Sequence, residues 1–435
     1  MGIGASFVVG LGAGWGLAEL LRRPAQVTTT SGETLTPPAA ATATSTPAAG
    51  ARKPQKFRLA FVAFQTGAAS VFGVPATNAA KLAVDMINSG GGILGVPVEL
   101  DVRDESGGAQ QQVALYRQLV EGGINAYVGL ISSADCLAVA PVAEELGSTL
   151  TVFFDCATKQ LVDQGMMKKV VFRTGGTSVA DGVSLARYVI SKMPNLKTVV
   201  GLNQDYAYGR DEWADFKTAL LKLKPDVQVL DELFTPLYTT DYSAQISRIL
   251  SLKPDLVHTS FWGPDLVNFI TQAKGRGLFD VTKVAFARGE FGLAHGLPDG
   301  QFVEGPYYRG FPDPRVYPLN RDFVSEYRKR YGEDPPYPAY HAAIAVMGVK
   351  FAIEAAAAVE NVEWPDLSAV VKVLERLAYV TPGGFIVMTK THNAWSGAVV
   401  GTSRGGALAD LYYSHPAECN PPPGTSSDEW FRSWA

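Results

Sequence analysis

The stretch from Phe57 to Asn88 decides the fold, and it reads FRLAFVAFQTGAASVFGVPATNAAKLAVDMIN. Phe57–Phe64 is a short apolar run that is typical of a buried β-strand. Apolar residues at helical spacing then predict a helix over Pro75–Asn88. A strand, a loop and a helix in this order form the unit from which parallel α/β sheets are built.

The same unit repeats along the chain in two series, one before and one after the stretch RTGG at residues 173–176. The first series has predicted strands at Phe57–Phe64, Val96–Val102, Ala126–Leu130 and Leu150–Phe154, and helices at Pro75–Asn88, Gln110–Val120 and Cys136–Leu146. The second has predicted strands at Thr198–Leu202, Val227–Leu233, Leu256–Ser260 and Lys283–Ala287, and helices at Val179–Ser191, Glu212–Leu223, Tyr242–Leu250 and Asp265–Ala273. Further helices are predicted near Leu319–Tyr331, Ala339–Val359 and Leu367–Ala378. We therefore expect an α/β protein with two doubly wound lobes.

Composition excludes several classes of function. The 435 residues include 38 basic and 42 acidic side chains, so no basic excess favours nucleic-acid binding. Three cysteines do not make a disulfide scaffold or a multi-cysteine zinc site, and the five histidines form no close pair. We therefore expect no metal, no cofactor and no nucleic-acid partner.

Two glycine-rich motifs suggest enzymes but stand in the wrong context. Gly90–Gly95 fits a dinucleotide-binding pattern, yet a helix precedes it and a strand follows it, which is the reverse of the required order. Gly401–Gly405 fits a nucleophile elbow, but no long helix follows it. Asp410 and His415 lie too close to Ser403 for a catalytic triad of that fold. The chain is therefore not expected to be an enzyme.

The first 55 residues are expected to lie outside the two lobes. Residues 1–23 are apolar and rich in glycine, and two interpretations stand open, an export signal and a membrane anchor. Residues 24–55 are rich in proline, alanine and threonine, which predicts a disordered linker. An apolar segment followed by a polar linker places the rest of the chain in the periplasm or at the cell surface.

Small hydroxyl and aromatic side chains follow the predicted strands and form a candidate ligand site. Ser132 and Ser133 follow a strand and open a helix, where a hydroxyl and free backbone N–H groups suit an anion. The alternative is that either serine only caps its helix.

In the second lobe, aromatic and charged residues occupy the equivalent positions. Tyr208 and Trp262 would stack on a ligand, and the alternative is packing within the lobe. Glu290 would pair with an ammonium or amide group, whereas Arg288 would pair with a carboxylate, and one of the two is expected to be solvated.

From Lys56 to about Ser403 the chain resembles periplasmic binding proteins of ABC transporters, of the leucine/isoleucine/valine-binding type. The resemblance is carried by TGAASVFG, AVDMINSGGGILG, VGLISSAD, FRTGG, DYAYG, KPDLVHTSFWGPD and PGGFIVMTKTHNAW. No single piece is specific, whereas their order and spacing over about 350 residues are.

The resemblance implies two lobes joined by a three-strand hinge, with lobe 1 at residues 56–174 and 306–385 and lobe 2 at residues 175–305 and 386–435. It implies capture of a branched-chain amino acid-like ligand, an amide or an aromatic acid by hinge closure. The implied partners are the ABC transporter permease subunits in the membrane, and the receptor is expected to be a monomer. The alternative is a ligand-sensing ectodomain, which a neighbouring kinase gene would favour.

The resemblance also assigns roles to residues. Ser133 would bind a carboxylate, while Glu290 and the backbone carbonyl of Asp155 would bind an amino group. Ala157 stands where the family usually has a threonine, which weakens the case for an ordinary α-amino acid. The full predicted set is Phe72, Ser132, Ser133, Asp155, Cys156, Ala157, Tyr208, Trp262, Glu290 and Tyr337. Cys136 and Cys156 form a possible disulfide, and the alternative is three free thiols including Cys419.

Overall fold

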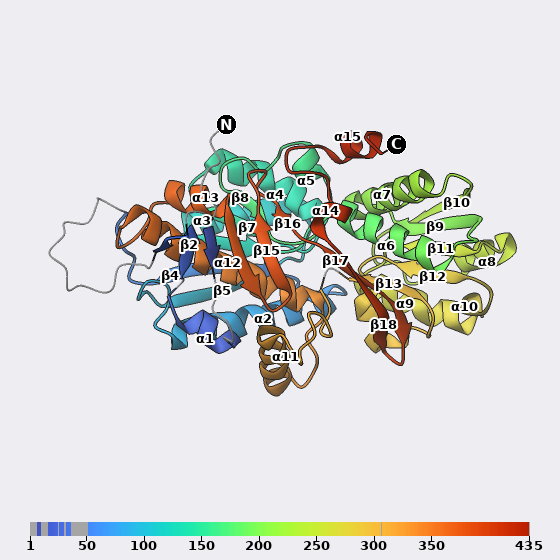
Figure 1. The fold of residues 1–435 in the computed structure, drawn as a ribbon, viewed down its shortest axis with the longest axis horizontal. Helices are drawn as coiled ribbons and strands as arrows, with labels where there is room; N and C mark the ends of the chain where they lie inside the picture. Colours follow the sequence, from blue (N-terminus) through green and yellow to red (C-terminus); the bar gives the residue numbers. More distant parts are fainter. Residues whose placement is uncertain are drawn as a thin grey trace. The chain divides into compact units, whose positions relative to one another are not determined.

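The computed structural model describes residues 7–9, 16–24, 26–29, 32–35, 51–305 and 307–434 of the chain. The chain divides into two compact units, and Figure 1 labels most of their elements. Unit 1 contains the residues up to Asp155 together with Gln164–Gly175 and Arg309–Trp395. Unit 2 contains Cys156–Asp163, Gly176–Tyr308 and the residues from Ser396 onward.

Unit 1 is built around a sheet with the strand order β5-β4-β6-β7-β8, in which every neighbouring pair is parallel. The apolar run at Phe57 forms β4 inside this sheet, and most of its side chains are buried. Near-continuous burial is expected where helices cover both faces of a parallel sheet. The strands are β4 (Phe57–Ala63), β5 (Val98–Asp104), β6 (Ala126–Gly129), β7 (Leu150–Phe153) and β8 (Val171–Arg173).

Helices cover both faces of this sheet: α2 packs with α12, and α3 packs with α4. The hydroxyl of Tyr116 on α3 lies 2.7 Å from the hydroxyl of Thr151 on β7, which ties that helix pair to the sheet. Helix α12 is apolar and long enough to cross a membrane, but it is buried in the core of the unit. The helices are α2 (Ser70–Ser89), α3 (Ala109–Glu121), α4 (Ser133–Leu146), α11 (Pro318–Tyr331), α12 (Tyr337–Glu360) and α13 (Leu367–Leu374).

A second sheet in unit 1 has the strand order β16-β15-β14-β1-β2-β3 and includes three strands that precede residue 36. Its elements are β1 (Phe7–Val9), β2 (Val27–Thr29), β3 (Thr34–Leu35), β14 (Leu377–Thr381), β15 (Gly384–Met388) and β16 (Ala394–Trp395), with α1 (Leu17–Arg22) between β1 and β2. Parts of the expected signal or anchor (1–23) and of the expected linker (24–55) thus form regular elements. Residues 51–55 are described and form no helix or strand, whereas residues 1–6, 10–15, 25, 30–31 and 36–50 lie outside the described residues.

Unit 2 contains a sheet with the strand order β10-β9-β11-β12-β13-β17-β18. The strands from β10 to β13 pair in parallel, and β17 and β18 add antiparallel pairs. The strands are β9 (Thr198–Gln204), β10 (Gln228–Thr235), β11 (Leu256–Thr259), β12 (Lys283–Phe286), β13 (Phe302–Gly305), β17 (Ala398–Arg404) and β18 (Ala407–Ser414).

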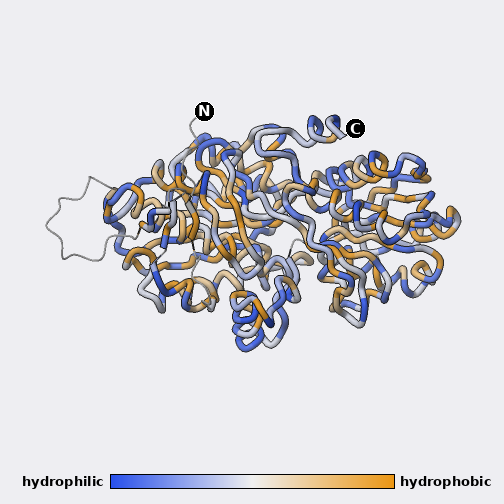
Figure 2. The backbone as a smooth tube through the Cα atoms, in the orientation of Figure 1, coloured by the Kyte–Doolittle hydropathy of each residue, from blue (hydrophilic) through white to orange (hydrophobic). Residues whose placement is uncertain are grey.

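The two faces of this sheet carry separate apolar cores. On one face, Trp213 and Phe216 of α7 pack with α6. On the other face, Tyr242 at the start of α8 packs with Phe269 of α9. Hydrophobic residues accordingly line the strands between the helices (Figure 2). The helices are α5 (Gln160–Asp163), α6 (Ser178–Lys192), α7 (Ala207–Leu223), α8 (Ser243–Leu252), α9 (Gly263–Gly275), α10 (Leu278–Val281), the 3-10 helix η1 (Gly289–His295), α14 (Pro416–Cys419) and α15 (Ser427–Arg432).

The predicted α/β architecture of two doubly wound lobes is confirmed, with differences near the end of the chain. Unit 1 continues to Trp395 because β15 pairs with β14 and β16 pairs with β15, whereas the sequence interpretation ended lobe 1 at residue 385. The helix expected over Leu367–Ala378 ends at Leu374 because Leu377 already belongs to the buried strand β14. The strands β17 and β18 were not predicted, because the glycines around residue 405 interrupt the alternation of apolar and polar residues that is typical of a strand.

Candidate functional site

The carboxyl ends of the parallel strands in unit 1 lead into the loops that carry the predicted site residues. Ser132 is the N-cap residue of α4 and Ser133 is its first residue, and both are buried. Asp155 follows β7, and Phe72 lies in the first turn of α2 after β4. Open α/β sheets bind ligands at this edge.

The side chain of Glu105 accepts hydrogen bonds from the backbone N–H groups just before α4. The backbone N–H of Ile131 donates to both carboxylate oxygens of Glu105 at 2.8 and 2.9 Å, and that of Ser132 donates to Oε1 at 2.7 Å. The expectation that these N–H groups are free for a ligand anion is therefore wrong for Ile131 and Ser132. Glu105 was missed, although it is a buried acid only three residues beyond the predicted strand Val96–Val102.

Two further acids, Asp135 and Asp155, lie close to Glu105. Burial, together with the nearby carboxylates of Asp135 and Asp155, holds the pKa of Glu105 well above its usual range. Burial also raises the pKa of Asp135, in the first turn of α4, to about 6. Glu105 and Asp135 therefore keep their protons to a higher pH than isolated carboxyl groups do.

We expect the protein to lose stability as the pH rises from about 4 to 7. Asp135 keeps its proton up to about pH 6 in the folded chain but only to about pH 3.9 in the unfolded chain. Between these values the folded state binds more protons, so the contribution is present at pH 4 and is lost above pH 6. The contribution is on the order of 2 kcal/mol, to be measured by denaturant unfolding across this pH range.

Asp135→Asn should reduce this dependence on pH because the amide does not titrate. The matched control is Asp428→Asn, since the side chain of Asp428 is largely exposed. A slope that stays the same in Asp135→Asn would contradict the assignment.

Contacts between neighbouring side chains connect three predicted residues of unit 1, namely Phe72, Tyr337 and Asp155, through His341. The rings of Phe72 and Tyr337 meet edge to face at 5.3 Å, and the ring of Tyr337 lies 5.4 Å from that of His341. His341 Nδ1 in turn lies 3.4 Å from Asp155 Oδ1. His341 was missed by sequence reasoning, although it stands one helical turn after Tyr337 on a predicted helix.

In unit 2, Tyr208 and Trp262 belong to one aromatic cluster around Tyr206. Trp262 precedes α9 and its indole N–H donates to the hydroxyl of Tyr206 at 2.7 Å. The ring centroids of Tyr208 and Trp262 lie 6.2 and 6.5 Å from that of Tyr206. Tyr238 completes the cluster with its ring 6.3 Å from Trp262. The structure thus brings the two predicted aromatics together, and it adds Tyr206 from the same DYAYG motif.

Arg288 and Glu290 follow β12, and both are buried, so the expectation that one of them is solvated is wrong. Arg288 adopts a left-handed backbone conformation with φ of 52°. Its Nε donates to Asp181 Oδ2 at 2.7 Å, and its backbone N–H donates to Glu304 Oε2 at 2.9 Å. The guanidinium therefore takes part in an internal ion pair. Sequence reasoning missed Asp181, which lies 107 residues from Arg288 along the chain, and Glu304, which lies 16 residues from it.

Cys156 and Ala157, the remaining predicted residues, directly follow Asp155 in the chain. Cys136 and Cys156 are disulfide-bonded, and Cys419 is the free cysteine of the described residues. The backbone carbonyl of Ala157 accepts a hydrogen bond of 2.8 Å from Ser178. Within the part of the chain that the structure describes, no group of three or more metal-ligating side chains occurs.

Known proteins resemble this chain over most of its length. A family model described as "Periplasmic binding protein" matches residues 56–407. The chain is 32% identical to the Leu/Ile/Val-binding protein BraC3 of Rhizobium johnstonii, over 48% of this chain and 55% of that protein. It thus spans only about half the length of that relative. Identity to Leu/Ile/Val-binding protein homolog 3 of Brucella melitensis is 28%, over 71% of this chain and 80% of that protein.

Solved structures show the same fold at lower identity. A solute binding protein of an ABC transporter from R. palustris, in complex with benzoate, matches with a TM-score of 0.74 at 18% identity, covering 83% of this chain and 97% of that one. A leucine binding protein from Thermotoga maritima matches with a TM-score of 0.71 at 22% identity, covering 83% of this chain and 99% of that one. The chain belongs to the periplasmic binding protein family and has the type I fold that its sequence resembles.

Proposed function

We propose that the protein is the extracytoplasmic solute-binding receptor of an ABC importer. The observation that carries the proposal is the family match over residues 56–407, which includes most of both α/β units. Each unit would contribute part of the ligand contacts, so that binding favours a closed form which the permease subunits recognise. No bond would be made or broken in this cycle.

The ligand that we propose offers hydrogen-bond donors, as an amide or an amine does, to the edge of unit 1. The backbone N–H groups of Ile131 and Ser132 are already paired with Glu105, and two further acids lie close by. A ligand carboxylate placed there would find these backbone donors already taken, whereas an amide or ammonium group could donate to the oxygens of the nearby acids. The alanine at position 157, in place of the hydroxyl common in the family, supports the same choice.

The test is a thermal-shift screen of the full chain with matched pairs of ligands. Each pair keeps the apolar part and changes the head group: leucine with leucinamide and benzoate with benzamide, with urea as a small amide. A ligand at 100 times its dissociation constant should add about 2.7 kcal/mol of stability. We expect the amide of a pair to stabilise more than the acid.

The outcomes separate the two levels of the proposal. Stronger stabilisation by the acids would contradict the ligand class while leaving the receptor function in place. Turnover of a bound ligand, or the failure of every small solute to stabilise the chain, would contradict the receptor function itself.

A further inference from the structure

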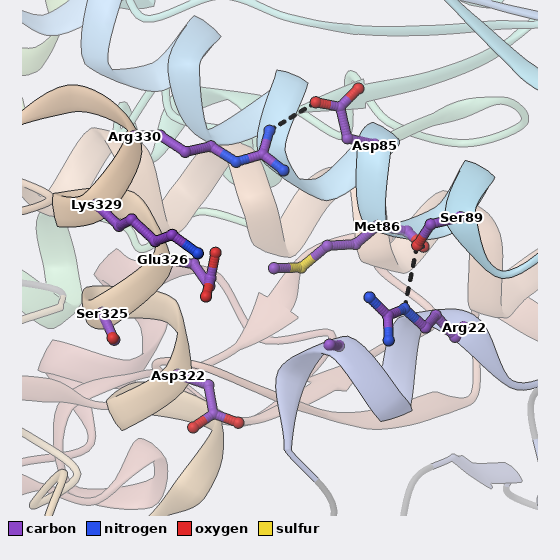
Figure 3. A pocket seen from close by; sticks show the side chains of 10 residues that line it. Arg22, Asp85, Met86, Ser89, Asp322, Ser325, Glu326, Lys329 and Arg330 are labelled. Carbon is purple, nitrogen blue, oxygen red and sulfur yellow. Dashed lines mark hydrogen bonds and ion pairs between the residues drawn. The ribbon is translucent and has the colours of Figure 1, made fainter.

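The pocket of about 400 Å³ beside α2 and α11 depends on the N-terminal segment (Figure 3). Ala18 and Arg22 form part of its wall, and both belong to residues 1–23, the expected export signal or anchor. Arg330 of α11, another wall residue, is already paired with Asp85 of α2 at 2.6 Å. A feature that adds to the function has to be formed by residues that remain in the exported receptor.

A short loop of unit 2 carries two of the predicted site residues, Cys156 and Ala157. The loop comprises residues 156–163, and the chain enters it from Asp155 of unit 1 and leaves it to Gln164 of unit 1. Its second half forms α5, a helix of only four residues. A helix this short is not stable in isolation, so contacts from outside the loop hold it in place.

Two carboxylates on one face of α7 hold the first half of the loop. Asp211 and Asp215 are four residues apart, so they lie on the same face of the helix. The hydroxyl of Thr158 donates to Asp211 Oδ2 at 2.5 Å, and Lys159 Nζ lies 2.7 Å from Asp215 Oδ1. The side chain of Asp215 is 1% exposed, and its Oδ2 accepts a further hydrogen bond of 2.8 Å from the hydroxyl of Ser178.

The second half of the loop is held by the C-terminal segment, residues 415–434. Ser427 is the first residue of α15, and its backbone N–H donates to Asp163 Oδ1 at 3.1 Å while its hydroxyl donates to Asp163 Oδ2. Ser427 is completely buried, so the loss of these two acceptors would be costly. Asp428, the next residue, places a carboxylate oxygen 3.9 Å from Lys159 Nζ.

The C-terminal segment is itself fixed to the core of unit 2. Phe431 is 5% exposed and belongs to the apolar core around α6 and α7. Asn420 Nδ2 donates to the backbone carbonyl of Ser396 at 2.8 Å, and Lys222 Nζ donates to that of Trp434 at 3.1 Å. A segment that is anchored on both sides of α15 provides a fixed support for the loop.

We propose that the C-terminal segment (415–434) is a latch that positions the loop 156–163, and with it the two candidate site residues at the start of the loop. Ser427 and Asp163 are positioning residues, because they act on the site through the loop. The latch lies beyond the range that the family model matches, which ends at residue 407. Its effect on ligand affinity rests on the proposed function, whereas its hold on the loop does not.

Hydrogen exchange of the full chain, measured without ligand, tests the hold on the loop. The amides of Val162 and Asp163 each donate to the carbonyl of Lys159 at 3.0 Å, so their exchange reports the opening of α5. We expect Ser427→Ala to speed exchange in a peptide that covers residues 156–163 by about tenfold, because a hydrogen bond to a carboxylate is lost. The sequence of this peptide is the same in the variant and in the wild type.

Asp163→Ala and the double variant show whether the two residues act as one pair. If they do, the double variant should exchange no faster than Asp163→Ala alone. Ser433→Ala is the matched control, because the hydroxyl of Ser433 also lies at α15 but donates to the carbonyl of Trp430. Exchange that stays unchanged in Ser427→Ala, or that becomes equally fast in Ser433→Ala, would overturn the latch.

The affinity for an amide separates positioning of the site from stability alone. Calorimetry uses leucinamide or benzamide, whichever stabilises the wild type in the thermal-shift screen. We expect Kd to rise about threefold in Asp163→Ala and to stay unchanged in Ser433→Ala, because the apparent Kd rises as the fraction of molecules with the loop in place falls. An unchanged Kd in Asp163→Ala would overturn the positioning role. If neither amide binds the wild type, that result counts against the proposed function, and the exchange rates still decide the latch.

Discussion

Replacement of Arg288 by methionine is expected to lower the free energy of unfolding by about 3–5 kcal/mol. The side chain of Arg288 is 3% exposed and its Nε is paired with Asp181 at 2.7 Å. Its guanidinium also lies 5.5 Å from the ring centroid of Tyr208. Removal of this cation would leave buried acids, Asp181 and Glu304 among them, without the positive charge beside them.

Denaturant unfolding of Arg288→Met beside Arg210→Met measures this effect. Arg210 forms an ion pair of 2.6 Å with Asp205, but both side chains are about half exposed, so its loss should change stability by about 1 kcal/mol or less. The loss in Arg288→Met should be smaller at pH 5 than at pH 8, because the stranded acids then take up protons. Equal losses for the two arginines would show that burial does not set the strength of the Arg288 pair.

Replacement of Trp262 by alanine is expected to weaken ligand binding by about 2 kcal/mol or more, roughly a 30-fold rise in Kd. Trp262 lies at a carboxyl edge of the unit 2 sheet, directly before α9, and it packs with Tyr206 and Tyr238. A large rigid ring at such an edge is the type of residue that carries binding energy in a recognition site. Calorimetry with the ligand found in the screen measures the effect.

Trp364→Ala is the matched control for this experiment. Trp364 is also buried, but it packs on Phe57, at the amino end of β4 and away from the carboxyl edge of the unit 1 sheet. Its loss should reduce stability and leave the affinity unchanged. An unchanged affinity in Trp262→Ala would assign Trp262 to packing within unit 2, which was the alternative that the sequence left open.

The positions of the candidate site residues were predictable where they follow from the place of a residue along a strand. Ser133, Asp155, Tyr208 and Trp262 come directly after apolar runs, so the order of residues along the chain is enough to place them at a sheet edge. Glu105 was not predicted as a partner of Ile131 and Ser132, because that contact joins loops that follow different strands. Their contact depends on which strands become neighbours, which the order along the chain does not state.

The amino-acid sequence was sufficient to establish the alternation of strands and helices, the division into two α/β lobes and the family, because periodicity and order along the chain are local properties. Only the folded chain shows which acceptor each donor binds: Arg288 binds the carboxylate of Asp181, and Lys350 binds the backbone carbonyl of Arg23. Folding also places residues 7–9 and 27–29 in a sheet of unit 1, although composition predicted a leader and a linker there. Short segments with weak propensity take a structure only when a complementary surface supplies the hydrogen bonds and the buried area, and that surface is formed by distant parts of the chain.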